Sequence, residues 1–228
     1  MAKNEGRPRA LGGRLQGKIS RLGAALEKPM NPHSHGLDDR HGARQPERFD
    51  PERASRLDYP ARFEYLPPEQ VAEMLAIPAG GTVLDFGTGT GTYALELARL
   101  RPDVEVIAFD EQPEMLDLLR AKPAAGEFAN LKPALPDEIE AHKGKIDRVL
   151  ALNVLHELGD EALRNLRALL KHGGAALFID WNAAVERPAG PPADHVYSPV
   201  EGRARLEQMG FKVRGEKLFP YHYSILAD

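Results

Sequence analysis

The amino-acid sequence predicts an α/β fold, a three-layer αβα sandwich in which helices cover both faces of a mostly parallel sheet. From residue 67 onward, short apolar segments typical of buried strands alternate with amphipathic segments typical of helices, which is the pattern of a parallel sheet. A glycine-rich turn separates the first of these strands from the helix that follows it. The last two strand segments follow each other without a helix, which indicates a hairpin at one side of the sheet.

The expected helices have apolar positions three or four residues apart, and several begin at proline or end at glycine. They cover residues 69–77, 92–100, 114–121, 161–171 and 199–209. The expected strands are short apolar segments bounded by turn residues. They cover residues 82–86, 104–109, 131–135, 146–152, 175–181, 211–219 and 221–226. Pro133 interrupts the weakest strand, and Gly173 and Gly174 are expected to cap the helix before them.

The N-terminal part of the chain differs from the rest in composition. Residues 1–29 carry seven Lys or Arg against two Asp or Glu, and the following stretch is rich in proline and glycine. We expect residues 1–45 to be a basic, mostly disordered tail and linker. Residues 46–228 would then form one domain, with residues 46–80 as N-terminal lid helices and residues 81–228 as the core.

Composition excludes several kinds of protein. None of the 228 residues is Cys, so a disulfide framework, a thiolate metal site and a cysteine nucleophile are all excluded. The formal net charge is −4, so no global basic field attracts nucleic acid, and we expect no nucleic-acid partner. No apolar segment reaches the length of about 18 residues that a membrane span requires. These features predict a cytoplasmic protein whose oligomeric state the sequence leaves open.

The glycine-rich turn gives the strongest functional signal. Gly87, Gly89 and Gly91, with Thr88 between the first two, follow a buried strand and precede a helix, where backbone N–H groups face a ligand. Dinucleotide-binding turns would have a third glycine at position 92, which is a threonine here. Asp85 lies at the end of the strand, where a carboxylate disfavours a pyrophosphate but favours a cationic ligand. The turn therefore predicts S-adenosylmethionine, which has a sulfonium and an ammonium and no phosphate, as the cofactor.

Two further carboxylates are candidate ligands of the cofactor. Asp110 ends the second strand, about 20 residues after the glycine turn, where a carboxylate can accept hydrogen bonds from ribose hydroxyls. Asp137 follows the third strand and could accept a hydrogen bond from the adenine amino group. Asp137 also has the position of an ordinary residue in the first turn of a helix, and Asp110 that of a helix cap.

The segment from Asp85 to Gly91, Asp110, residues 146–158 and residues 170–174 together resemble class I, Rossmann-like, S-adenosylmethionine-dependent methyltransferases. The resemblance is to the small-molecule methyltransferase-domain type, in a prokaryotic subgroup of unassigned acceptor, with quinone-biosynthetic C-methyltransferases as familiar relatives. It runs from about residue 49 to the C-terminus. It implies a seven-stranded sheet in the order 3-2-1-4-5-7-6 with strand 7 antiparallel. It also implies that Asn153 lies beside the methionine part of the cofactor.

Three histidines are the candidate catalytic residues. His156 follows the fourth strand, His195 lies in the loop after the fifth, and His222 begins the last strand. If that strand is antiparallel, all three lie at the edge of the sheet where α/β folds bind ligands. An imidazole with a pKa near 6.5 can accept a proton from an acceptor, and we expect this role rather than metal binding. Three imidazoles holding a metal and three structural histidines are the alternatives.

The function that these features predict is methyl transfer from S-adenosylmethionine to a small-molecule acceptor, because no separate recognition domain is evident. Two alternatives remain. The protein could methylate RNA or protein and dock through the basic residues 1–29. It could also be a regulatory protein that binds the cofactor without catalysis. The sequence does not identify the acceptor or the atom that is methylated.

Overall fold

The structure is a computed structural model that describes residues 51–228. The predicted tail, residues 1–45, lies outside the described residues. The helical elements are η1 (Pro51–Arg56), α1 (Arg62–Tyr65), α2 (Pro68–Leu75), α3 (Thr92–Leu100), α4 (Pro113–Ala121), η2 (Pro123–Gly126), α5 (Pro136–Ile139), η3 (Glu140–His142), η4 (Leu155–Glu157), α6 (Asp160–Leu169), η5 (Ala193–His195) and α7 (Pro199–Gln208). The strands are β1 (Thr82–Phe86), β2 (Glu105–Phe109), β3 (Leu131–Ala134), β4 (Ile146–Leu152), β5 (Leu170–Trp181), β6 (Val213–Leu218) and β7 (His222–Ala227).

All seven strands form one sheet in the order β3-β2-β1-β4-β5-β7-β6. Strands β1 to β5 pair in parallel, whereas β7 is antiparallel to both β5 and β6. The predicted α/β class, strand order and antiparallel last strand are therefore confirmed. Trp181 pairs with His222, so β7 begins at the edge of the sheet where β5 ends.

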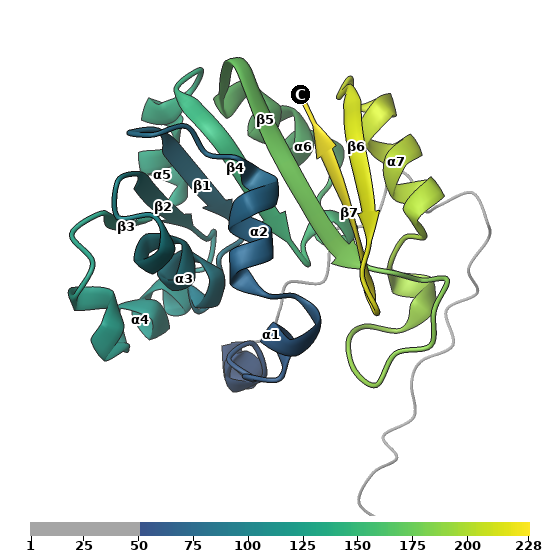
Figure 1. Cartoon of the computed structure of the whole chain (residues 1–228), viewed down its shortest axis with the longest axis horizontal. Coiled ribbons are helices and arrows are strands. Elements are labelled where there is room, and N and C mark those ends of the chain that lie inside the picture. The colour runs from purple at the N-terminus through teal and green to yellow at the C-terminus, as the bar shows by residue number, and fades with distance from the viewer. Residues whose placement is uncertain (1–50) are drawn as a thin grey trace, which may run out of the picture. The chain divides into compact units, whose positions relative to one another are not determined.

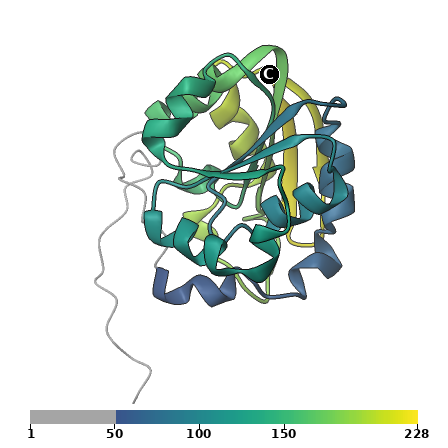
Figure 2. The same cartoon turned by 90° about the vertical axis from the view of Figure 1, so that its left-hand side faces the viewer.

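The helices form two layers, one on each face of the sheet (Figures 1 and 2). On one face, α2, α3 and α4 bury their apolar side chains, including Val71, Leu97 and Leu116, against β1, β2 and β4. On the other face, α5, α6 and α7 pack against the same sheet through residues such as Leu166 and Leu206. Because strands β1 and β2 are buried on both faces, each is a nearly continuous apolar segment.

Two local features concern a proline in strand β3 and the end of helix α6. Pro133 has no N–H to donate, and β3 tolerates it because β3 is an edge strand. The prediction that Gly173 and Gly174 cap a helix is wrong, because α6 ends at Leu169 and both glycines lie in β5. The backbone N–H of Lys145 donates a hydrogen bond to the Leu169 carbonyl, so a residue outside the helix satisfies this carbonyl where α6 ends. A Cβ on Gly174 would lie 2.9 Å from the carbonyl oxygen of Ile146, so close strand packing requires this glycine.

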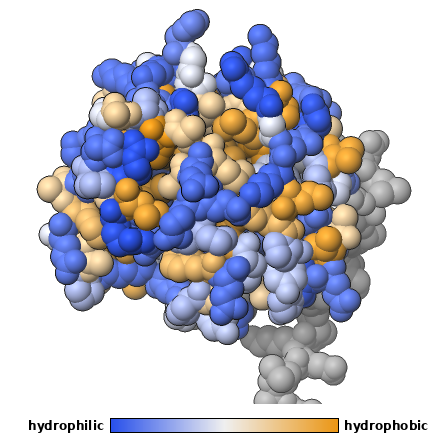
Figure 3. Space-filling view, in the orientation of Figure 1, coloured by the Kyte–Doolittle hydropathy of each residue, from blue (hydrophilic) through white to orange (hydrophobic). Residues whose placement is uncertain are grey.

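Large apolar side chains are exposed at only a few separated places in the described part of the chain. They are Tyr59, Leu118, Val200 and Leu218. The face shown in Figure 3 likewise intersperses hydrophobic with hydrophilic residues. Within residues 51–228, no helix combines the length and apolarity required to cross a bilayer.

Candidate functional site

The glycine turn between β1 and α3 is held in a conformation that favours glycine. Gly89 and Gly91 have φ angles of 56° and 76°, in the left-handed region. A Cβ on Gly91 would lie 2.3 Å from Leu119 Cδ1 on α4, and a Cβ on Gly89 would lie 2.9 Å from Leu57 Cδ1. The turn therefore needs glycine at these positions both for its backbone angles and for close packing.

A cavity of about 380 Å³ opens at the ends of β1, β2 and β4, beside this turn. The volume is within the range of about 300–1,000 Å³ that small-molecule and cofactor sites occupy. Six of the eight residues predicted to bind the cofactor line it: Asp85, Gly87, Thr88, Gly89, Asp110 and Asn153. The other two do not. Gly91 caps α3 beneath Leu119, and Asp137 is exposed in the first turn of α5, although its neighbours Pro136 and Ile139 line the cavity.

Asp85 is a buried carboxyl group at the end of β1. It is 3% exposed, and its carboxylate accepts a hydrogen bond of 2.7 Å from the Thr88 hydroxyl. Burial raises the pKa of Asp85 to about 6, with the nearby Asp110 adding to the rise and Thr88 opposing it. A cationic group in the cavity would restore the ionised form, as the sequence reasoning expected of S-adenosylmethionine.

Asp110, at the end of β2, fixes the glycine turn. Its carboxylate accepts hydrogen bonds from the backbone N–H groups of Gly89, at 2.8 Å, and Gln112, at 3.0 Å. Burial raises the pKa of Asp110, and these two hydrogen bonds oppose the rise. Each carboxylate oxygen can accept a further hydrogen bond, so Asp110 can hold the turn and still receive a ligand hydroxyl.

Asn153, immediately after β4, has a buried side-chain oxygen that lacks a hydrogen-bond partner among the described residues. Its φ of 59° is unusual for a residue other than glycine, and its N–H donates to the Ile179 carbonyl at 2.7 Å. Its side-chain Oδ1 is buried without a hydrogen-bond partner among the described residues, and the residue lines the cavity. An amide oxygen in this state requires a donor, which the ammonium group of S-adenosylmethionine can supply. The residues present thus fit the cofactor.

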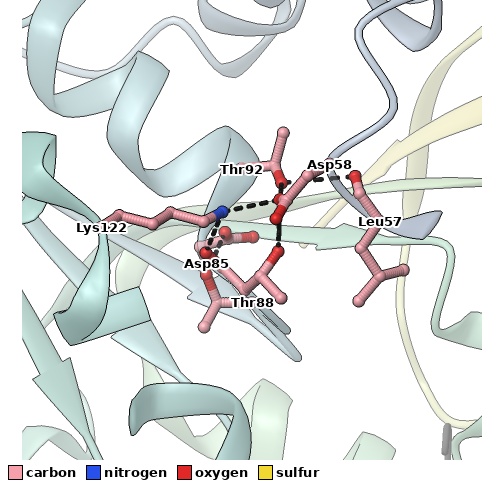
Figure 4. Close-up of polar contacts among 7 residues, drawn as sticks. Leu57, Asp58, Asp85, Thr88, Thr92 and Lys122 are labelled. Atoms are coloured by element: carbon pink, nitrogen blue, oxygen red, sulfur yellow. Dashed lines mark hydrogen bonds and ion pairs between the residues drawn. The ribbon is translucent and has the colours of Figure 1, made fainter. Parts of the chain in front are cut away.

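The segment of residues 51–66, which we call the N-terminal segment, lies against the glycine turn. Its Leu57 and Arg62 line the cavity. Asp58 Oδ1 accepts hydrogen bonds from the Thr90 and Thr92 hydroxyls, at 2.6 and 2.7 Å, and pairs with Lys122 Nζ at 2.6 Å (Figure 4). Burial would raise the pKa of Asp58, but these three donors outweigh burial and lower it. One carboxylate thus joins the N-terminal segment to α3 and α4.

His156, in η4 directly after β4, pairs with a buried carboxylate. Its Nδ1 lies 2.8 Å from Asp180 Oδ1, and its backbone N–H donates to Asp180 Oδ2 at 2.9 Å. Asp180, near the end of β5, is fully buried and also accepts from the N–H of Trp181. Because a carboxylate only accepts, Nδ1 carries the proton and Nε2 is left as the basic nitrogen. Burial would lower the pKa of His156, but Asp180 outweighs burial and raises it.

Glu157 connects this pair to the cavity. It lines the cavity, and its Oε1 lies 3.6 Å from His156 Nε2. Burial raises the pKa of Glu157 to about 7, and His156 opposes the rise. Glu157 can therefore hold or release a proton near neutral pH beside the basic nitrogen of His156, as is common among functional carboxyl groups.

His222 and His195 have contrasting surroundings. His222, the first residue of β7, is 1% exposed, and both ring nitrogens are buried without a partner among the described residues. Its ring lies against Trp181, at 4.0 Å between centroids, and is stacked on Tyr65 at 5.7 Å. Burial lowers the pKa of His222 to about 4. The side chain of His195 is exposed on η5. None of the three predicted catalytic histidines, His156, His195 and His222, is among the residues that line the cavity.

The structure places two of the three predicted histidines near one buried carboxylate: His156 bonds to Asp180 directly, and His222 pairs across the sheet with Trp181, the residue after Asp180. Within residues 51–228, no group of three His, Cys, Asp or Glu side chains is arranged to hold a metal ion. Sequence reasoning missed Asp180, Glu157, Asp58 and Arg62. Asp180 could have been found by the rule that identified Asp85 and Asp110, since it too is an acid near the end of a parallel strand.

Comparison with known proteins identifies the family of this chain. The family model of a methyltransferase domain matches residues 57–218. A crystal structure of an S-adenosylmethionine-dependent methyltransferase from Aquifex aeolicus is 30% identical and covers 79% of this chain and 98% of its own, with a TM-score of 0.73. The chain belongs to this methyltransferase-domain family of S-adenosylmethionine-dependent enzymes. The predicted family, enzyme class and cofactor are thereby confirmed.

Curated relatives are similar over part of their length. An uncharacterized methyltransferase-like protein of Schizosaccharomyces pombe is 30% identical over 172 residues, which are 74% of this chain and 62% of that protein. A malonyl-[acyl-carrier protein] O-methyltransferase of Herminiimonas arsenicoxydans is 34% identical over 55% of this chain and 46% of its own. A ubiquinone/menaquinone biosynthesis C-methyltransferase of Geotalea uraniireducens is 29% identical over 45% and 46%. The chain therefore spans less than two thirds of the length of these relatives.

Replacing Asp58 tests the contact between the N-terminal segment and the glycine turn. Because the pKa of Asp58 is lowered by folding, its stabilisation is present above the unfolded value of about 3.8 and is lost as pH falls through the folded value. The Asp58 side chain is 38% exposed, so water screens its ion pair with Lys122. We expect Asp58→Asn to lower the free energy of unfolding at pH 7 by about 1 kcal/mol, measured by urea denaturation. The loss should disappear in acid. Asp117→Asn, which breaks an exposed pair with Arg120, is the control.

His222 predicts a loss of stability in acid. Its folded pKa of about 4 lies below the unfolded value of 6.5, so between these values the unfolded chain binds more protons and stability falls as pH is lowered. The shift corresponds to about 3 kcal/mol lost between pH 6.5 and 4. We expect His222→Phe to remove most of this pH dependence in urea denaturation, while the exposed-site variant His195→Phe retains it. An unchanged pH dependence in His222→Phe would show that His222 is not buried as a neutral ring.

Proposed function

We propose that the protein transfers the methyl group of S-adenosylmethionine to a hydroxyl oxygen of a small-molecule acceptor. The observation that carries the proposal is the buried pair His156–Asp180: the His156 Nε2 lies 3.6 Å from Oε1 of Glu157, and Glu157 lines the cofactor cavity. A weakly acidic acceptor needs a base, whereas an acceptor that is already anionic does not. The malonyl and quinone-pathway relatives, whose names state acceptors other than nucleic acid, agree with a small acceptor.

The glycine turn, Asp85, Asp110 and Asn153 would hold the cofactor. When bound, S-adenosylmethionine supplies an electrophilic methyl group on a sulfonium. Asp110 is placed to accept from hydroxyl groups, and the Asn153 amide oxygen is placed to accept from an ammonium. Asp85 adds negative charge where the ligand carries positive charge. Asp137 as an adenine partner stays a prediction, since its side chain is exposed beside the cavity.

His156 would act as the general base. Its Nε2 accepts the proton of the acceptor hydroxyl, and Asp180 stabilises the imidazolium that forms and keeps Nδ1 protonated. Glu157, with its pKa near 7, then takes up the proton or passes it to water. His222 and His195 as bases stay predictions: His222 is a poor base at neutral pH, and His195 is exposed.

The N-terminal segment would act as the lid that the sequence predicts for residues 46–80. Leu57 and Arg62 form part of the cavity wall, so the segment excludes water from the reacting groups while it is in place. Its attachment through Asp58 consists of hydrogen bonds and an ion pair at a partly exposed site. Such contacts are individually weak enough to open and close as ligands exchange.

Transfer of a labelled methyl group tests the proposal. Protein incubated with labelled S-adenosylmethionine should label members of a panel of small hydroxyl compounds. We expect His156→Gln to lower turnover by about 10²–10⁴-fold while the cofactor affinity stays nearly unchanged. Label recovered in RNA or protein, and lost when residues 1–29 are removed, would instead support docking through the basic tail. Cofactor binding without transfer to any compound would support a non-catalytic protein.

The cofactor assignment is tested by calorimetry. Because Asp110 is placed to accept hydrogen bonds from the ligand, Asp110→Ala should weaken S-adenosylmethionine binding by about 1–3 kcal/mol. Asp110→Asn, which keeps an acceptor oxygen for Gly89, separates loss of the ligand contact from disorder of the turn. Asp137→Ala measures the adenine contact in the same experiment. Unchanged affinity in Asp110→Ala, with the fold intact, would remove Asp110 from the site.

The state of His156 can be measured without an acceptor. Since Asp180 raises the pKa of His156, NMR titration of its ring should give a value above 6.5 in the wild type. Asp180→Asn removes the carboxylate and leaves burial to act, so the pKa should fall below that of the wild type. In Asp180→Asn, the rise of methyl-transfer activity with pH should begin at a lower pH, and the maximum activity should be lower than in the wild type. An unchanged pKa in Asp180→Asn would rule out the pairing.

A further inference from the structure

Arg62, the first residue of α1 in the N-terminal segment, brings a positive charge to the wall of the cavity. Its guanidinium carbon lies 5.9 Å from the centroid of the Tyr93 ring, and both residues line the cavity. The Tyr93 hydroxyl donates to the Leu66 carbonyl at 2.8 Å, so the ring under Arg62 is itself fixed to the N-terminal segment. Arg62 is thereby held at the first turn of α3, directly after the glycine turn.

This charge has no anionic partner in the described part of the chain. Two cations line the cavity, Arg62 and Lys143, and Lys143 forms an ion pair with Glu140 at 2.5 Å. No Asp or Glu within residues 51–228 lies at ion-pair distance from Arg62. Burial raises the pKa of Asp85, and the charge of Arg62 is among the influences that oppose the rise. Arg62 can therefore pair with an anionic group of a ligand in the cavity.

Arg62 belongs to one end of the cavity. In the sheet, β1 has β2 on one side and β4 on the other; Asp110 follows β2 and Asn153 follows β4. Helix α1 lies toward β4 and the strands beyond it, because its last residue, Tyr65, stacks on His222 at the start of β7. Arg62 and Asn153 therefore share the end of the cavity that is away from Asp110.

These two side chains make opposite demands on a ligand. The Asn153 Oδ1 is buried without a partner among the described residues, so it needs a hydrogen-bond donor. The Arg62 guanidinium only donates, and it pairs best with a carboxylate. An α-amino acid carries an ammonium and a carboxylate on the same carbon, so it meets both demands at once. S-adenosylmethionine ends in such a group.

We propose that Arg62 binds the α-carboxylate of S-adenosylmethionine, and that this ion pair holds the N-terminal segment closed over the occupied cofactor site. The inference rests on the lid role in the proposed function and adds the ligand group that closes the lid. The ion pair can form only while the segment is in place, so the carboxylate stabilises the closed position over an open one. Asp58 bonds to Thr90 without a ligand, whereas Arg62 responds to the ligand.

Matched ligands with and without the carboxylate test the binding role. The full chain is titrated calorimetrically with S-adenosylmethionine and with decarboxylated S-adenosylmethionine, which keeps the adenosine, the sulfonium and the amine. We expect the wild type to bind S-adenosylmethionine about 10-fold or more tightly, which corresponds to about 1.4 kcal/mol. In Arg62→Gln the two ligands should bind with nearly equal affinity. Arg62→Lys retains the charge and should keep part of the preference.

Arg56→Gln is the matched control. Arg56 is exposed on η1 in the same segment and does not line the cavity, so this variant should keep the full preference for S-adenosylmethionine.

Hydrogen exchange tests the closing role. At equal saturation, S-adenosylmethionine should slow amide exchange in residues 51–66 of the wild type more than its decarboxylated form does. In Arg62→Gln the two ligands should give equal protection, while unchanged exchange in β4 and β5 shows that the core is intact. The inference is overturned if the wild type does not prefer S-adenosylmethionine, if the preference is undiminished in Arg62→Gln, or if both ligands protect the wild-type segment equally. Failure of both ligands to bind would instead overturn the proposed function.

Discussion

The hydrogen bond from the Gly89 N–H to the Asp110 carboxylate joins two neighbouring strands at the edge of the sheet where the cavity lies. It is possible because β1 and β2 are parallel and Phe86 pairs with Phe109, so that Gly87 and Asp110 follow the two strands at the same level. The side chain of Leu57 packs against Gly89 of the turn that this hydrogen bond fixes, and the side chain of Leu119 packs against Gly91. Cavity wall, helix α3 and the N-terminal segment therefore all depend on this one turn.

Several buried polar side-chain atoms at this edge of the sheet have no hydrogen-bond partner within residues 51–228. Asn153 Oδ1, Arg187 Nη1 and both ring nitrogens of His222 are buried without partners among the described residues. Native proteins leave few such groups, and those that remain commonly mark positions where a ligand completes the hydrogen bonding. The three residues follow β4, follow β5 and begin β7, so they lie around the same edge of the sheet. Of the three, only Asn153 lines the cavity, so its amide oxygen is the unsatisfied atom placed beside the predicted cofactor.

Much of the fold could be predicted because its signals are local. Alternating strands and helices, a glycine turn after a strand and a final hairpin predict the α/β class, and the family resemblance supplied the strand order. Asp85 and Asp110 were found since each is an acid at the end of a strand. The end of α6 was misplaced, because it depends on the carbonyl of Leu169 being taken by Lys145, a contact that the helix sequence does not contain.

Asp180 is likewise an acid near the end of a strand, but its pairing with His156 could not be predicted in the same way. His156 and Asp180 are brought together by the register in which Leu152 pairs with Ile179, and periodicity does not encode that register. The position of Asp58 against Thr90 and Lys122 likewise depends on a segment that joins no strand of the sheet. Asp137 has the correct position in the sequence, but its carboxylate is exposed because the first turn of α5 faces solvent there.

The N-terminal segment contacts two places in the core, since Leu57 lies on the glycine turn and Tyr65 lies on His222. Both contacts belong to one short continuous segment, so a displacement of the whole segment would expose the glycine turn and the ring of His222 together. If the segment is the proposed lid, one movement would therefore control both the exchange of cofactor and the release of the methylated product. The opening of such a lid would then limit the rate of turnover.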